Sequence, residues 1–114
     1  MAKSRTTHDK LQSDCFIWFH NTYPKLRGLM WSTYNNPKNA AHGAYLKSIG
    51  MVKGVHDMQF YYNGVLYGFE FKVGSDKLRP EQIKWGKQIE MQGGEWYEIR
   101  SVEEFKQIVK DKLK

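Results

Sequence analysis

The chain has 114 residues, which fits one domain and leaves little room for a second. Its formal net charge of +6 suggests a polyanionic partner, and ordinary solubility charge is the alternative explanation. The single cysteine, Cys15, excludes an internal disulfide and favours a reducing, intracellular compartment. No apolar run resembles a signal peptide or approaches the roughly 20 residues of a membrane span, so no membrane partner is expected.

The first quarter of the chain predicts one helix and one strand. Residues 1–7 form an expected flexible basic arm, and residues 8–114 form the expected domain. A helical pattern runs over residues 8–23 and stops at Pro24, because the residue before a proline is pushed out of the helical region. Residues 29–34 predict a strand. The stripe of the helix expected to face inward consists of Leu11, Cys15, Trp18, Phe19 and Thr22.

A loop and a short helix come next. The composition of residues 35–37 predicts the loop. Residues 39–49 predict the helix, and Gly50 stands where a C-terminal glycine belongs. Its expected inward residues are Ala41, Tyr45, Leu46 and Ile49.

Residues 57–72 predict a β-hairpin. Two alternating runs flank Asn63-Gly64, the strongest short hairpin signal, because both central residues of a type I′ turn need positive φ. This turn fixes the register, so that Asp57 lies opposite Glu70 at the open end. The pairs expected nearer the turn are Tyr62 with Val65, Phe60 with Tyr67, and Met58 with Phe69. The apolar face comprises Met58, Phe60, Tyr62, Val65, Tyr67, Phe69, Phe71 and Val73.

The remaining elements predict an α/β fold. Pro80 suits the first position of a helix over residues 80–92, which is followed by a strand over residues 95–100. A Ser101–Glu104 capping box then opens a last helix. A helix between the hairpin and the last strand indicates a parallel crossover, so we expect a mixed sheet with a central hairpin flanked by helices. The inward residues of the two helices are Ile83, Trp85 in part, Gly86, Ile89, Val102, Phe105, Ile108 and Val109.

The other face of the hairpin carries the candidate chemistry. Directly opposed like charges are destabilising, so the pairing of Asp57 with Glu70 calls for a cation between them. Carboxylate oxygens suit Mg²⁺, which takes one or two protein carboxylates and keeps several waters. Lys72, two residues after Glu70 on the same face, can orient a nucleophilic water and face a phosphate oxygen. The alternative is an ordinary exposed Glu/Lys alternation.

Polar and basic residues surround this cluster. Gln82 lies in the first turn of the next helix and can reach the same site, although a solvated surface glutamine is equally plausible there. Cations near the helix start can contact phosphates, or can simply be solvated. The candidate nucleic-acid contacts are Asn35, Asn36, Lys38, Lys53, Lys77, Arg79 and Lys84.

The sequence offers little support for other chemistry. The four histidines (His8, His20, His42 and His56) and Cys15 lack zinc-finger spacing. No glycine-rich phosphate loop or nucleophile elbow is present in the sequence.

Three motifs in order resemble the VRR-NUC branch of the PD-(D/E)xK nuclease superfamily. They are Gly54-Val-His-Asp57, Phe69-Glu-Phe-Lys72 and Pro80-Glu-Gln82. The family shows a Gly-Val-Pro-Asp turn, a Glu-x-Lys strand and a Ser-Pro-Glu-Gln helix start. Gln12, Lys38-Asn39, Leu46-Lys47, Gly50 and the closing Gly93-Gly94 also fall in the family's order, so the resemblance covers roughly residues 8 to 110.

The resemblance implies a restriction-endonuclease-like fold and Mg²⁺- or Mn²⁺-dependent hydrolysis of phosphodiester bonds. It implies that Asp57, Glu70 and the backbone carbonyl of Phe71 bind the metal, that Lys72 assists the water, and that Gln82 supports the site. It further implies an intracellular phage or bacterial DNA endonuclease acting on branched, flapped or junction DNA, as a homodimer.

The chain departs from the family's pattern at three places. His56 replaces the usual proline, so we expect a less rigid turn before Asp57. Arg79 replaces the usual serine, which removes an N-cap. The family often carries an acid on its first helix; the nearest equivalents here are His8 and Leu11, with Asp9 and Asp14 close by, so a ligand from this helix stays open.

Two alternatives to a nuclease remain open. One is a catalytically inactive nucleic-acid-binding domain with the same fold, which the complete Asp, Glu and Lys set argues against. The other is a basic protein-interaction module with no role on nucleic acid.

Overall fold

The computed structural model describes residues 2–33 and 37–114, and for residues 2–6 it describes the backbone alone. It is a single compact α/β domain built on a four-stranded sheet with the order β1-β2-β3-β4. The elements are α1 (Ala2–Thr22), the 3-10 helix η1 (Pro24–Leu26), β1 (Met30–Ser32), α2 (Ala40–Ser48), β2 (Met58–Tyr62), β3 (Val65–Phe71), α3 (Pro80–Met91), β4 (Glu95–Ile99) and α4 (Val102–Lys112).

The predicted hairpin is confirmed with its register. Asn63 and Gly64 have φ values of 52° and 82°, as a turn between tightly paired strands requires. Three pairs of β2 and β3 are as expected: Tyr62 with Val65, Phe60 with Tyr67, and Met58 with Phe69. The register sets Asp57 immediately before β2 and Glu70 near the end of β3.

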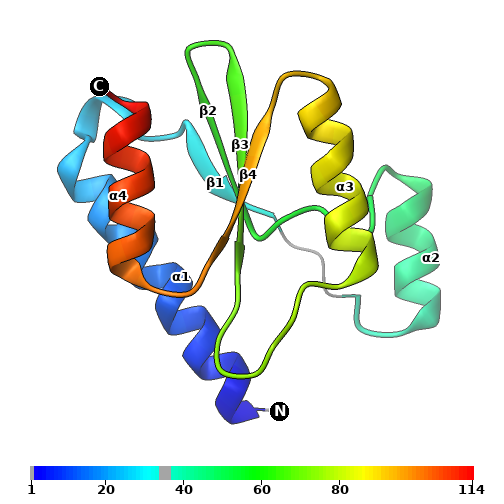
Figure 1. The fold of residues 1–114 in the computed structure, drawn as a ribbon. Helices are drawn as coiled ribbons and strands as arrows, with labels where there is room; N and C mark the ends of the chain where they lie inside the picture. The colour runs from blue at the N-terminus through cyan, green and yellow to red at the C-terminus, as the bar shows by residue number, and fades with distance from the viewer. Residues whose placement is uncertain (1, 34–36) are drawn as a thin grey trace.

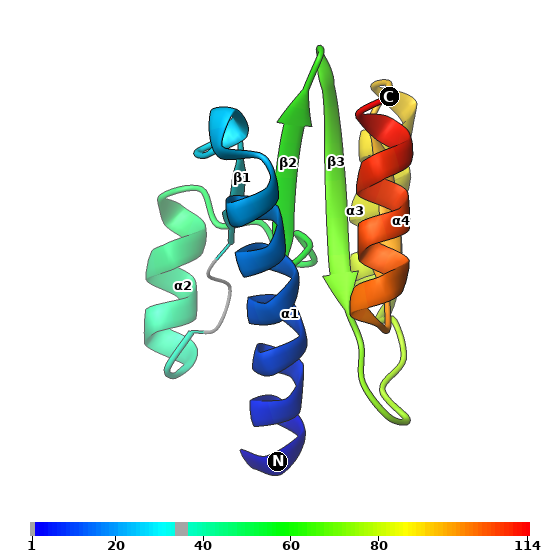
Figure 2. The ribbon, with the colours of Figure 1, turned by 90° about the vertical axis from the view of Figure 1, so that its left-hand side faces the viewer.

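The sheet is mixed, as predicted. β1 and β2 pair antiparallel, β2 and β3 pair antiparallel, and β3 and β4 pair parallel across the α3 crossover. Helices α1 and α4 lie on one side of the sheet, and α3 and α2 lie on the other (Figure 1). Turned by 90°, the ribbon shows α1 running alongside β1 and β2 (Figure 2).

The hydrophobic core lies between the sheet and the α1–α4 pair. Phe105 of α4 is fully buried, with its ring centroid 5.0 Å from that of Phe69 and 6.2 Å from that of Phe71. Phe19 of α1 packs edge-on against Phe60 at 5.1 Å. The buried members of this cluster are Cys15, Phe19, Met30, Met58, Phe60, Tyr67, Phe69, Phe71, Ile99, Phe105 and Val109.

Several boundaries differ from the sequence predictions. α1 begins at Ala2, so residues 2–7, expected as a loose arm, belong to the helix. β1 is confined to Met30–Ser32, which stand opposite Phe60, Gln59 and Met58 of β2. The described helices include none that is long and apolar enough to cross a membrane.

The predicted inward face of α2 is wrong. Tyr45 and Ile49 are 60% and 64% exposed, and Leu46 is only half-buried. The buried residue of this helix is Gly43, which packs on Pro37. The cause is geometric: α2 stands at the side of the domain, and α3 is the helix that covers this face of the sheet (Figure 1).

Candidate active site

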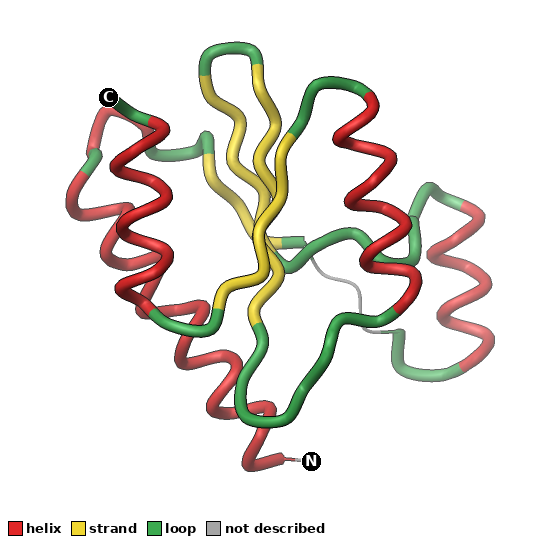
Figure 3. Tube along the Cα trace, in the orientation of Figure 1, coloured by secondary structure: helices red, strands yellow, loops and turns green. Residues whose placement is uncertain are grey.

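The predicted acids, lysine and glutamine meet at one end of the sheet. Asp57 precedes β2, Glu70 lies near the end of β3, and Lys72 follows this strand directly. Gln82 reaches the cluster from the first turn of α3. Beyond this end of the sheet, a loop joins β3 to α3 (Figure 3).

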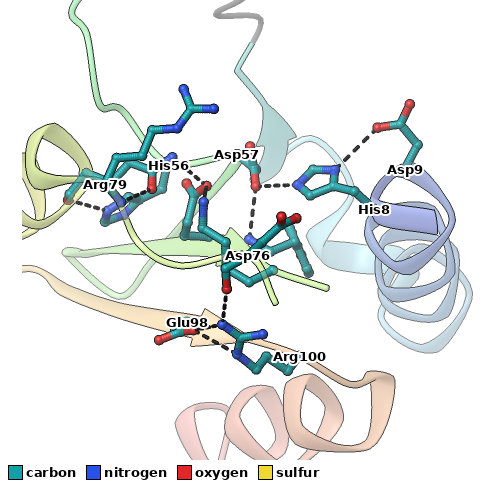
Figure 4. A network of polar contacts seen from close by, with 12 residues as sticks. His8, Asp9, His56, Asp57, Asp76, Arg79, Glu98 and Arg100 are labelled. Atoms are coloured by element: carbon teal, nitrogen blue, oxygen red, sulfur yellow. Dashed lines mark hydrogen bonds and ion pairs between the residues drawn. The ribbon is translucent and has the colours of Figure 1, made fainter. Parts of the chain in front are cut away.

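The Asp57 carboxylate is held from two elements. Its Oδ2 atom accepts a hydrogen bond from the Phe71 backbone N–H at 2.9 Å. The same oxygen accepts one from His8 Nε2 at 3.0 Å, and Figure 4 shows the imidazole reaching Asp57 from α1. The Asp57 side chain keeps 26% of its surface exposed, so solvent and ligands retain access to it.

Glu70 is a buried acid whose two oxygens differ in their contacts. Only 2% of the residue is exposed. Its Oε2 atom accepts a hydrogen bond from Gln82 Nε2 at 2.9 Å and lies 3.4 Å from Lys72 Nζ. Its Oε1 atom is buried and has no hydrogen-bond partner among the described residues. Such an atom is costly, because a buried polar group without a partner loses its hydration.

Burial is the main cause that raises the pKa of Glu70, to about 8. The negative charge of Asp57 raises this pKa further, and the ammonium of Lys72 opposes the rise. Two acids thus share one small space with a single buried lysine. At neutral pH, this arrangement favours either protonation of one of the two carboxyl groups or the binding of an additional cation between them.

His8 also belongs to this cluster, and its contact with Asp57 was not predicted from the sequence. The hydrogen bond to Asp57 is the main cause that raises the pKa of His8, to about 9, against the opposing effect of burial. The His8 ring also packs edge-on against Phe71, with 6.4 Å between centroids. The available signal was the missing acid on the first helix, for which His8 stands among the nearest equivalents.

His56 supports the turn before Asp57 instead of loosening it. The residue is fully buried, and its Nε2 atom donates a hydrogen bond to the Gln82 backbone carbonyl at 2.9 Å. Its ring packs against Trp85 and Trp96, each at 4.7 Å between centroids. Burial lowers the pKa of His56, so a neutral ring fills the gap above the sheet. The expected loss of rigidity is therefore offset by packing.

Gln82 has two partners that fix its amide. Its Oε1 atom accepts a hydrogen bond from the Arg79 backbone N–H at 2.9 Å, while its Nε2 atom donates to Glu70. Arg79 gives α3 no side-chain cap, as predicted, and the glutamine satisfies the free N–H of this position instead. Helix capping and orientation of the acid therefore depend on the same side chain.

The predicted basic contacts are exposed, and some of them border the site. Gly54 lies so close to α3 that an added Cβ would overlap the Glu81 backbone carbonyl, which places Lys53 beside the start of that helix. The guanidinium of Arg100 donates to the Gly74 and Asp76 carbonyls and so anchors the loop that carries Lys77 (Figure 4). The exposed cations are Lys38, Lys53, Lys77, Arg79 and Lys84.

Two predicted contacts receive no test, and one has no established link to the site. Asn35 and Asn36 lie outside the described residues. Lys38 stands before α2, where its backbone N–H donates to His42 Nδ1 at 2.9 Å. No described contact links Lys38 to Asp57 or Glu70.

The donor set fits a hard divalent cation that keeps much of its hydration. Within residues 2–33 and 37–114, no group of three or more histidine, cysteine or acidic side chains is gathered as a ready metal cage. Two carboxylates at the cluster nevertheless match what Mg²⁺ takes from proteins, and the unpartnered Glu70 Oε1 is the atom that a cation would satisfy.

Comparison of the chain with protein-family models, with curated proteins and with solved structures found no match.

Proposed function

We propose that this chain is a Mg²⁺- or Mn²⁺-dependent endonuclease that hydrolyses phosphodiester bonds in DNA. The supporting observation is the buried Oε1 atom of Glu70, which has no hydrogen-bond partner among the described residues and lies in a cluster that also holds Asp57 and Lys72. A purely structural acid in this position would be expected to have both oxygens paired. A perturbed acid with a specific charged neighbour is typical of functional sites.

Each residue of the cluster has a role in this proposal. Asp57 and Glu70 would hold the divalent cation, together with the Phe71 carbonyl that the resemblance implies. When bound, the cation would supply positive charge near the scissile phosphate and lower the pKa of a water molecule. Lys72 would orient that water and face a phosphate oxygen, and Gln82 keeps the Glu70 carboxylate in place through its 2.9 Å hydrogen bond.

The substrate class follows from charge and from the resemblance. Exposed cations at the start of α3 and in the loop before Asp57 would contact backbone phosphates, which predicts DNA affinity that falls as salt rises. The resemblance adds branched, flapped or junction DNA as the preferred substrate and a homodimer as the acting form. A cleavage panel of duplex, flap and four-way junction DNA would rank these substrates.

The deciding experiment compares Asp57→Ala, Glu70→Ala and Lys72→Ala with the wild type in Mg²⁺ or Mn²⁺. We expect each variant to lose at least about a thousandfold in cleavage rate, because a metal ligand or the water-orienting group is removed. Glu90→Ala, on the exposed side of α3, is the matched control and should cut like wild type. Cleavage by Glu70→Ala at the wild-type rate and with the same metal dependence would refute the proposal.

One observation favours a second candidate, a nucleic-acid-binding domain without catalysis. The described residues contain no preassembled group of three metal ligands. Such a domain would bind DNA in a salt-dependent way, yet would release no product in any divalent ion. A binding assay run beside the cleavage panel separates the two candidates.

A further inference from the structure

A hollow of about 460 Å³ lies between the hairpin and α3, on the face of the sheet that α3 covers. Its walls carry two aromatic side chains, Tyr61 from β2 and Trp85 from α3, and Leu66 of β3 adds apolar surface. Gly64 and Gly93 also line it, and an added Cβ at either would meet nothing within 4 Å. The missing side chains therefore leave room for a ligand between the two aromatic walls.

The rim of this hollow offers hydrogen-bonding groups. Gln88 on α3 and Gln92 at the C-terminal end of this helix line the hollow, and both are exposed. Each amide presents a donor and an acceptor, and the edges of nucleobases present the same two kinds of group. The side chain of Tyr61 is half-exposed, so its ring is available for stacking. Aromatic walls with a polar rim match a planar, heteroaromatic ligand.

The hollow shares one face of the sheet with the candidate active site. Leu66 lines the hollow, and Glu70 lies four residues further along β3, on the same face and about 13 Å away. Lys84 is exposed and stands one helical turn before Gln88 on the same side of α3. The hairpin turn and the C-terminal end of α3 lie together at the end of the domain away from the loop that joins β3 to α3 (Figure 1).

We propose that this hollow binds an unpaired nucleobase of a DNA strand whose backbone runs on to the candidate active site. The inference rests on DNA being the partner in the proposed function, and it adds a base-binding pocket to the acidic cluster. Every base has a π-face, so stacking on an aromatic ring is tolerant of sequence. A base inside a duplex is already stacked and paired, so the pocket selects for unpaired bases near the cut.

Charge favours nucleic acid over a protein segment as the occupant. Val52 lines the hollow, and the exposed Lys53 follows it directly in the chain. Lys53 and Lys84 are thus placed to meet the phosphates of a bound strand. A second copy of this chain would instead bury the half-exposed side chains of Tyr61 and Val52 against itself. The first occupant predicts base-dependent DNA binding, and the second predicts a change in oligomeric state.

The first experiment measures DNA binding by fluorescence anisotropy, with the full chain at one salt concentration and with a chelator, so that no cleavage occurs. The probes are a blunt duplex and the same duplex with a single-stranded tail in either polarity. Tyr61→Ala should weaken binding of a tailed probe by about fivefold or more, because a stacked base typically contributes at least that much. Binding of the blunt duplex should change by less than about twofold, because its bases stay stacked on one another.

Two further variants serve as controls. Tyr61→Phe keeps the ring and should bind the tailed probe like wild type, which separates stacking from loss of the hydroxyl group. Tyr45→Ala removes a tyrosine that is 60% exposed on α2, outside the hollow, and should leave the affinity for both probes unchanged. Wild-type affinity of Tyr61→Ala for both tailed probes, or an equal loss on tailed and blunt probes, would overturn the proposal.

A readout on the wild type keeps the proposal testable even if Tyr61→Ala folds poorly. A fluorescent adenine analogue, moved along the tail, should lose emission at one particular position when the protein binds, because stacking quenches it. An abasic nucleotide at that position keeps the phosphates and should weaken binding by about fivefold or more. Unchanged emission at every position, or full affinity for the abasic probe, would refute base binding. So would a Tyr61→Ala variant that changes only the oligomeric state in analytical ultracentrifugation.

This inference and the proposed function fail separately, because binding is measured without divalent ions. A chain that stacks an unpaired base on Tyr61 but cuts no DNA would retain the pocket and lose the nuclease. A chain that cuts DNA, but whose Tyr61→Ala variant binds tailed DNA like wild type, would retain the nuclease and lose the pocket.

Discussion

The two faces of the sheet are packed by different rules. The face under α1 and α4 is filled by apolar and aromatic side chains that interlock around Phe105 and Phe69. The face under α3 encloses four buried polar atoms that lack a hydrogen-bond partner among the described residues. These atoms are His56 Nδ1, Gln59 Oε1, Glu70 Oε1 and Trp96 Nε1.

The difference separates the apolar packing that stabilises the domain from the buried polar cluster of the candidate site. Close packing of apolar groups on the α1–α4 side supplies the favourable free energy of folding. That stability allows the α3 side to keep a buried acid and a buried lysine, Glu70 and Lys72, which would be costly in a weaker fold. Substitutions on the two faces should therefore have different consequences.

The largest expected effect on stability is on the apolar face. Phe105→Ala should lower the free energy of unfolding by about 3–5 kcal/mol, because it leaves a cavity where three aromatic rings meet Phe105. Urea denaturation measures the change. Ile17→Ala on α1, where the side chain is 52% exposed, is the control and should cost less than about 1 kcal/mol. Equal losses from the two variants would contradict the comparison.

On the polar face, one substitution should increase the stability of the fold instead of lowering it. Folding raises the pKa of Glu70 from 4.5 to about 8, so this group stabilises the metal-free fold fully below pH 4.5 and loses that contribution as pH rises through about 8. Glu70→Gln removes this loss of stability at high pH, because the glutamine amide does not ionise. We expect the variant to exceed wild type in stability above pH 8 by on the order of 3 kcal/mol.

Urea unfolding at a series of pH values, in the presence of a chelator, measures this gain. The difference between variant and wild type should grow between pH 4.5 and 8. Added Mg²⁺ or Mn²⁺ should stabilise wild type above pH 8 and should act much less on Glu70→Gln. A gain that is constant with pH would show that the acid is not the cause.

The backbone of the polar face gives an intermediate effect. Gly54 has a φ of 95°, and an added Cβ would overlap the Glu81 carbonyl of α3. Gly54→Ala should cost about 2 kcal/mol or more in thermal or urea unfolding and should displace the turn that holds Asp57. Gly64→Ala has a similar φ of 82° but open space around it, so it should cost only about 1 kcal/mol. Equal costs would mean that the contact with α3 is unimportant.

The smallest effect is expected from a charge pair at the rim of the apolar face. Lys112 Nζ lies 2.6 Å from Glu95 Oε1, with both side chains partly exposed. Lys112→Met should lower stability by less than about 1 kcal/mol, because solvent and salt screen such pairs. The loss should shrink further at high salt, which separates it from the buried pair of Glu70 and Lys72.

Local signals predicted the hairpin and the last helix well. Asn63-Gly64 fixes the register, because a two-residue turn determines how the strands on either side of it pair. Ser101 caps α4 by accepting a hydrogen bond from the Glu104 N–H, as the motif predicts. Glu104 reaches back to the Arg100 N–H, one residue before the expected position.

Features set by tertiary contacts could not be predicted from the sequence. The periodicity of α2 predicted an inward face. The local sequence does not indicate that α3 covers this side of the sheet. The contact between His8 and Asp57 joins residues 49 positions apart, and only the path of α1 across the sheet brings them together. His56 likewise gains its support from Trp85 and Trp96, which lie far away in the sequence.

The candidate site draws its side chains from the first helix, the turn before β2, the end of β3 and the start of α3. No stretch of the chain shorter than residues 8–82 contains His8, Asp57, Glu70, Lys72 and Gln82 together. A chain that is still emerging from the ribosome therefore lacks a complete candidate site. Any cutting power would arise only once tertiary folding is complete.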